Sequence, residues 1–139
     1  MTKQTVNVLW NSQMAFTVDI DGYKIPIDAE ESVGGTGTGP CPKPLLLAAL
    51  AGCTAMDVIS ILRKMHIEPE YFNILTEGDV TEEHPKHFTK IHLIYEFKGE
   101  KLPIEQLRKA INLSQEKYCG VSETLRKAVE ITSEIKILD

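Results

Sequence analysis

The spacing of apolar residues along the chain predicts an ordered series of strands and helices. Polar and apolar residues alternate over 3–10, as in a half-buried strand. Turn residues separate this segment from two further short strands, 14–20 and 23–27. The second turn contains Asp21-Gly22, a pair that tolerates the positive φ angles of a tight hairpin. The chain is therefore expected to begin as a three-stranded antiparallel meander.

The segment 28–43 is rich in glycine and proline, and its composition predicts a loop. A glycine-rich loop that runs into a helix can bind phosphate, but the run GGTGTGP lacks the GxxxxGK[ST] spacing. We therefore interpret the segment as a connector that stays flexible until something orders it, in which glycine permits close backbone approach.

A strongly apolar helix is expected from Pro44 to about His66. Proline suits the first turn of a helix, and Pro69 follows closely after the expected end. From Leu45 to Met56 the side chains are apolar or small on every face, so the helix needs cover on all sides. A chain of 139 residues can hardly enclose such a helix alone, so we expect it to pack against a second copy in a homodimer.

The second half predicts two long strands, two helices and a closing strand. The expected ranges are 71–82 and 88–98 for the strands, 103–119 and 121–129 for the helices, and 130–138 for the last strand. Alternation places the core face of strand 88–98 on Thr89, Ile91, Leu93, Tyr95 and Phe97. Helical spacing gives the longer helix an apolar face made of Ile104, Leu107, Ala110, Ile111, Ser114 and Tyr118. The order βββ–α–ββ–α–α–β is that of an α+β protein, and the length predicts a single domain, 1–139.

Composition excludes several classes of function. Twenty acidic against 15 basic side chains give a net charge of −5, which disfavours nucleic acid as a partner. The N-terminus lacks the pattern of a signal peptide, and we interpret the apolar segment 45–62 as a buried helix rather than a membrane span. A cytoplasmic protein without a membrane partner is expected. In that compartment, three cysteines favour thiol chemistry over structural disulfides.

Cys53 and Cys119 are the candidate reactive residues. Cys53 lies three turns inside its helix, where the helix dipole acts weakly, and Asp57 one turn later disfavours a thiolate. Cys119 stands beside Gly120 at a helix end, where we expect it to be exposed and mobile. Two such thiols permit a peroxidatic–resolving cycle, although buried cysteines are often structural core residues. Cys41, between two prolines, is interpreted as an incidental thiol.

The histidines do not predict a metal site. His87 and His92 are an odd number of residues apart, so on one strand they face opposite sides. No CxxC motif is present, and neither a metal nor a cofactor is expected.

Three ordered blocks resemble the OsmC/Ohr superfamily of osmotically inducible and organic hydroperoxide resistance proteins. They are PLLLAALAGCTAMDVISILRKM, His84-Pro85 followed by FTKIHLIYEFKG, and AINLSQEKYCGVSETL. The resemblance implies an OsmC-like two-layer fold and an intertwined homodimer with its central helices packed together. It also implies that Cys53 is the peroxidatic and Cys119 the resolving thiol, in a site at the dimer interface. The implied substrate is an organic hydroperoxide, and the implied reductant is a dithiol or lipoylated compound.

The chain departs from the family's peroxidases in one respect. In those proteins an arginine of the N-terminal strands activates the cysteine, and a glutamate before the central helix holds that arginine. Here the first arginine is Arg63, and Lys43-Pro44 stands where the glutamate is expected. The candidate supporting residues are therefore Lys43, Glu30, Glu31 and Asp57.

Two main functions follow from these features. The first is a thiol-dependent peroxidase in oxidative stress defence that reduces organic hydroperoxides. The alternative is a non-peroxidatic relative that binds a small hydrophobic ligand or thiol compound at the dimer groove. A purely structural interaction protein is a third possibility.

Overall fold

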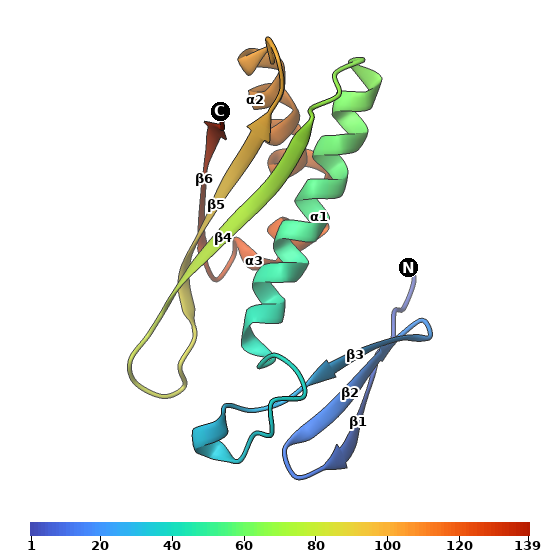
Figure 1. Cartoon of the computed structure of the whole chain (residues 1–139), viewed down its shortest axis with the longest axis vertical. Coiled ribbons are helices and arrows are strands. Elements are labelled where there is room, and N and C mark those ends of the chain that lie inside the picture. The colour runs from blue at the N-terminus through green and yellow to red at the C-terminus, as the bar shows by residue number, and fades with distance from the viewer. The chain divides into compact units, whose positions relative to one another are not determined.

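The computed structural model describes all 139 residues and has the expected α+β element order (Figure 1). In chain order the strands and α-helices are β1 (Asn7–Ser12), β2 (Ala15–Ile20), β3 (Tyr23–Ile27), α1 (Lys43–Lys64), β4 (Tyr71–Val80), β5 (Phe88–Lys98), α2 (Ile104–Leu113), α3 (Gly120–Leu125) and β6 (Glu130–Ile137). A 3₁₀ turn at Glu31–Val33 and a π-helical turn at Ser114–Tyr118 complete the series. The order βββ–α–ββ–α–α–β is therefore confirmed.

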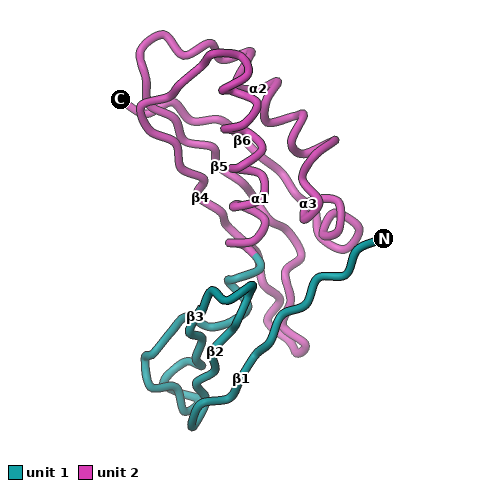
Figure 2. Tube along the Cα trace, turned by 90° about the vertical axis from the view of Figure 1, so that its right-hand side faces the viewer, with its two compact units in different colours: residues 1–46 teal, residues 47–139 magenta.

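The chain divides into two compact units, Met1–Leu46 and Leu47–Asp139 (Figure 2). The first unit contains the antiparallel sheet β1-β2-β3, in which residues such as Val18 and Ile25 are paired. Asp21 and Gly22 both have positive φ, as expected for the tight hairpin turn between β2 and β3. The expectation of a single domain stays a prediction.

Asp28 orders the glycine-rich loop of the first unit. Its carboxylate accepts hydrogen bonds from the backbone N–H and the hydroxyl of both Thr36 and Thr38, and from the N–H of Ala29. The bond to the Thr38 hydroxyl is the main cause that holds the pKa of Asp28 well below its usual range, followed by the Ala29 N–H. A Cβ at Gly35 would lie 1.8 Å from the Ala29 oxygen, so the loop requires glycine there.

The second unit is a two-layer structure. Strand β5 is central in its sheet, antiparallel to β4 and parallel to β6. Helices α1 and α2 pack on the same face of this sheet, because their buried residues share one core cluster with the inward side of β5. The fully buried members of that cluster are Leu50, Val58, Leu62, Ile91, Leu93, Tyr95, Phe97, Leu107 and Ala110.

The predicted core face of β5 is correct for four of its five residues. Thr89 is exposed, and its neighbour Phe88 is buried instead. The cause is a shift in the register with β4, where Asp79 pairs with Lys90 but Val80 pairs with Phe88. This irregularity reverses the alternation at the start of the strand.

Helix α1 is covered on one side within the second unit. Its buried residues are Leu50, Thr54, Val58 and Leu62, which recur at the spacing of one helical face. Met56 is 76% exposed, so the second unit alone does not cover the helix on every side. Helix α1 is long and apolar enough to cross a membrane. The core helices of water-soluble proteins meet the same criteria of length and composition.

Candidate thiol site

The structure brings Cys53, Asp57 and Cys119 together within the second unit. The two Sγ atoms and a carboxylate oxygen of Asp57 all lie within 4.8 Å of one another. Cys53 and Asp57 stand one turn apart on α1, so they share a helix face. Cys119 comes from the junction between the π-helical turn and α3. Two thiols that are distant in sequence therefore become close neighbours in space.

Cys119 is buried, contrary to the expectation of an exposed and mobile thiol. Only 3% of its surface is accessible, and its side chain belongs to the core cluster. Its Sγ accepts a hydrogen bond from the Ser122 backbone N–H at 3.4 Å, which caps the first turn of α3. Its own N–H donates to the Ser114 carbonyl at 2.7 Å. Cys119 is therefore hydrogen-bonded both to the preceding π-helical turn and to the first turn of α3.

The π-helical turn explains why the expected helix 103–119 was wrong over its last turn. Helix α2 ends at Leu113, and Ser114–Tyr118 continues with wider π-type turns. Such a turn contains an extra residue, which rotates all later side chains about the helix axis. Tyr118, expected on the apolar face, is consequently 53% exposed, while Cys119 points into the core.

A chain of buried hydroxyl groups leads to Asp57 beside the thiols, with Thr54 at its centre. The Thr54 hydroxyl is hydrogen-bonded to the Tyr95 hydroxyl at 2.8 Å and to the Ser114 hydroxyl at 2.7 Å. Ser114 in turn donates to a carboxylate oxygen of Asp57 at 2.9 Å. Each hydroxyl has a single proton to donate, so the direction runs from Tyr95 through Thr54 and Ser114 to Asp57. The carboxylate is the final acceptor of a continuous chain.

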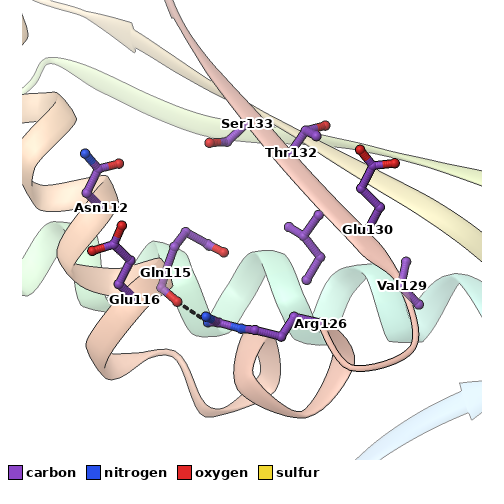
Figure 3. Close-up of a pocket in the computed structure, with 9 residues that line it drawn as sticks. Asn112, Gln115, Glu116, Arg126, Val129, Glu130, Thr132 and Ser133 are labelled. Carbon is purple, nitrogen blue, oxygen red and sulfur yellow. Dashed lines mark hydrogen bonds between the residues drawn. The ribbon is translucent and has the colours of Figure 1, made fainter.

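Gln115 connects this chain to the segment around Cys119. Its Nε2 donates to the oxygens of Thr54 at 3.1 Å and Tyr95 at 3.0 Å, and its Oε1 accepts from the Ser122 hydroxyl at 3.0 Å. Arg126 donates to the backbone carbonyls of both Gln115 and Ser122. Figure 3 shows Gln115 and Arg126 beside an open hollow between the π-helical turn and the start of β6. These bonds fix the two backbone segments that flank Cys119.

Burial raises the pKa of the Cys53 thiol above its ordinary value. A hydrogen bond from the Val121 backbone N–H acts in the opposite direction, while the neighbouring Cys119 and the charge of Asp57 raise the pKa further. The Asp57 charge therefore disfavours the Cys53 thiolate, as the sequence predicts. None of the groups that shift this pKa is basic. Burial also raises the pKa of the Tyr95 hydroxyl, which favours its role as a hydrogen-bond donor.

The other predicted supporting residues belong to the first unit. Glu30 and Glu31 are exposed at the 3₁₀ turn, and Lys43 is exposed at the first position of α1. Their supporting role stays a prediction. Cys41 is partly buried in the same unit, and all three cysteines are free thiols.

Sequence reasoning did not identify the polar residues around the thiols, which are Thr54, Tyr95, Ser114, Gln115 and Ser122. A signal was nevertheless present, because Thr54 and Ser114 each interrupt an otherwise apolar helix face. Buried hydroxyl groups need partners, so two of them on facing helices indicate a shared polar cluster.

Comparisons of the sequence and of the fold with known proteins each find relatives that match most of the chain. Residues 35–134 match the protein family described as OsmC-like protein. The protein YhfA of Escherichia coli K12 is 33% identical over 133 residues, which cover 94% of this chain and 96% of that protein. The crystal structure of a protein from Aquifex aeolicus VF5 aligns over the whole of both chains with a TM-score of 0.83 and 28% identity. An organic hydroperoxide resistance protein OsmC from Legionella pneumophila shares the fold, with a TM-score of 0.71 at 16% identity over 98% of this chain and 99% of that one.

We predict that Thr54→Val lowers the free energy of unfolding by about 1–3 kcal/mol, because the buried hydroxyls of Tyr95 and Ser114 each lose a partner. Thr89→Val is the matched control. Its hydroxyl is exposed, with a single contact of 3.5 Å, and the change should stay within about 0.5 kcal/mol. Urea unfolding followed by circular dichroism measures both values. Equal effects of the two substitutions would contradict a central role for Thr54.

Proposed function

The chain belongs to the OsmC-like family, and from this premise we propose that it is a cytoplasmic thiol peroxidase that reduces organic hydroperoxides in oxidative stress defence. The observation that carries the proposal is the proximity of the Cys53 and Cys119 sulfurs, within 4.8 Å in a partly apolar environment. The name of the relative from Legionella pneumophila is in keeping with this substrate class.

The unequal exposure of the two thiols supports separate roles. Cys53 is partly exposed in the single chain, whereas Cys119 is almost fully buried beside it. Cys53 is therefore the thiol that meets the substrate, and Cys119 is reached through Cys53. This assignment agrees with the peroxidatic and resolving roles that the family resemblance implies.

The proposed reaction has two steps. The Cys53 thiolate attacks the O–O bond of the hydroperoxide, and its sulfur becomes a sulfenic acid while the alcohol leaves after taking up a proton. The Cys119 thiol then attacks the sulfenic sulfur, which forms the Cys53–Cys119 disulfide and releases water. A dithiol or lipoylated reductant restores both thiols by disulfide exchange.

The exposed side of α1 supports a homodimer as the working form. Apolar or small residues remain exposed on the helix in the single chain, among them Leu46, Ala48, Ala49 and Met56. Exposed apolar side chains on one helix favour an interaction site, and an identical helix from a second copy is an equally apolar partner. Cys53 lies on the same helix, so the second copy would enclose the thiol site.

The alternative function is binding without peroxide reduction. The raised pKa of Cys53, together with the absence of a basic group among those that shift it, favours this alternative because a protonated thiol is a poor nucleophile. The ligand would be a small hydrophobic or thiol compound held at the groove of the dimer.

We expect the wild-type protein to consume cumene hydroperoxide in the presence of dihydrolipoamide, and Cys53→Ser to be inactive. Cys41→Ser makes the same change at the third cysteine and should keep the wild-type rate. Cys119→Ser should form the sulfenic acid once, trapped as a dimedone adduct, without forming the intramolecular disulfide. Intact mass spectrometry after a single equivalent of peroxide distinguishes these products. A wild-type rate no higher than that of Cys53→Ser would favour the binding function instead.

The oxidation rate should rise with pH because the pKa of Cys53 is raised and the thiolate is the reactive form. Below the pKa, the thiolate fraction increases about tenfold per pH unit, and an ordinary cysteine reaches half ionisation near pH ~8.5. We expect the single-turnover rate to increase throughout the neutral range without a plateau. Asp57→Asn removes a charge that raises the pKa, so its curve should shift to lower pH. A plateau at neutral pH in the wild type would show that another group stabilises the thiolate.

Sedimentation should give twice the mass of one chain at micromolar concentration. Met56→Glu places a charge on the exposed side of α1 and should shift the population toward monomer. Thr89→Glu introduces the same charge at an exposed strand position and should leave the dimer intact. A monomeric wild type would exclude this arrangement.

A further inference from the structure

We propose that reduced Cys53 and Cys119, together with Asp57, bind a Zn²⁺ ion, and that the bound ion keeps both thiols reduced and unreactive. The proposal uses the thiols of the proposed peroxidase, but zinc binding does not depend on peroxidase activity. It rests on the donor set, on the geometry of the three side chains and on the groups that surround them.

The donor set fits a thiophilic cation. Two thiolates and one carboxylate oxygen are among the ligands that zinc accepts, and sulfur donors select it over magnesium or calcium. The three donor atoms already lie within 4.8 Å of one another. A tetrahedral ion with bonds of about 2.3 Å to sulfur needs its sulfurs about 3.8 Å apart. The required contraction is therefore at most about 1 Å, within reach of side-chain rotation.

Hydrogen bonds from neighbouring groups hold two of the three donor atoms in place. The Ser122 N–H donates to the Cys119 sulfur at 3.4 Å. Ser114 donates to the Asp57 carboxylate at 2.9 Å. Hydrogen bonds of this kind orient metal ligands and offset the negative charge on thiolates. Asp57 and Cys119 are thus supported by a second layer of contacts, and Cys53 is positioned by helix α1.

The charge balance and access of the site also suit zinc. The two thiols lose their protons on binding, so two thiolates, one carboxylate and Zn²⁺ leave one negative charge. A hollow of about 110 Å³ beside Asp57 is lined in part by Ser60, Lys64 and Tyr118. This hollow opens one side of Asp57 to solvent. A water molecule can complete a four-coordinate ion.

Zinc binding and disulfide formation exclude each other in this arrangement. Both sulfurs share their electron pairs with the ion in the metal-bound state, whereas in the disulfide they are bonded to one another. When an organic hydroperoxide takes two electrons from the thiolates and two protons from solvent, it is reduced to an alcohol and water and the S–S bond forms; the site then loses its two main ligands and releases Zn²⁺. The ion therefore regulates the thiol pair by competing with its oxidation.

Calorimetric titration of the fully reduced protein with zinc chloride tests the proposal. We expect one Zn²⁺ per chain for the wild type and for Cys41→Ser, which retains all three donors. Cys53→Ser should weaken binding at least about 100-fold, and Asp57→Asn about 10-fold, since the latter loses one oxygen donor but keeps both thiolates. Titration with Co²⁺ adds a direct readout, because thiolate coordination produces a charge-transfer absorption that should be absent in Cys53→Ser. Circular dichroism confirms that each variant is folded.

The oxidised wild-type protein provides a comparison without any substitution. After formation of the Cys53–Cys119 disulfide, zinc binding should be lost and should return after reduction. Equal zinc affinity of the reduced and oxidised forms, or unchanged affinity of Cys53→Ser, would overturn the proposal. So would the absence of binding to the reduced wild type. Peroxide consumption by zinc-free protein is measured separately, so failure of the zinc site is distinguishable from failure of the peroxidase.

Discussion

The site depends on the hydrogen-bonded chain that passes through the Thr54 hydroxyl. This one group joins α1 to β5 through Tyr95 and to the π-helical turn through Ser114. In a buried environment these bonds are strong, and each hydroxyl polarises the next along the direction that ends at Asp57. The chain fixes the distance between the helix that bears Cys53 and the segment that bears Cys119, because both attach to it. Apolar packing alone would leave that distance less well defined.

The same burial that brings the thiols together also suppresses the ionisation of Cys53. Desolvation and the Asp57 charge oppose a thiolate, while the Val121 N–H is the only contact that favours one among the groups that shift this pKa. A raised pKa at Cys53 slows its oxidation, because the thiolate is the reactive form.

Much of the fold followed from the sequence, since alternation and helical spacing are properties of contiguous residues. The order of elements, the exact bounds of β3 and β5 and the inward position of Leu93 and Tyr95 needed nothing else. The burial of Phe88 and of Cys119 could not be anticipated in this way. Each results from a local departure from regular geometry, a register shift in one case and a π-helical turn in the other. The polar cluster was missed for a different reason, since it joins residues that meet only after folding.

The π-helical turn has a consequence for how this chain can vary. A π-type turn corresponds to one residue added to an otherwise regular α-helix. Removing a residue between Ser114 and Tyr118 would restore the regular helix, but it would rotate everything beyond it by about 100°. Cys119 would keep its place in the amino-acid sequence and lose its place beside Cys53. The length of this short segment therefore matters as much as the identity of the two cysteines, and a relative that retains both thiols but lacks the extra residue would have no matched pair.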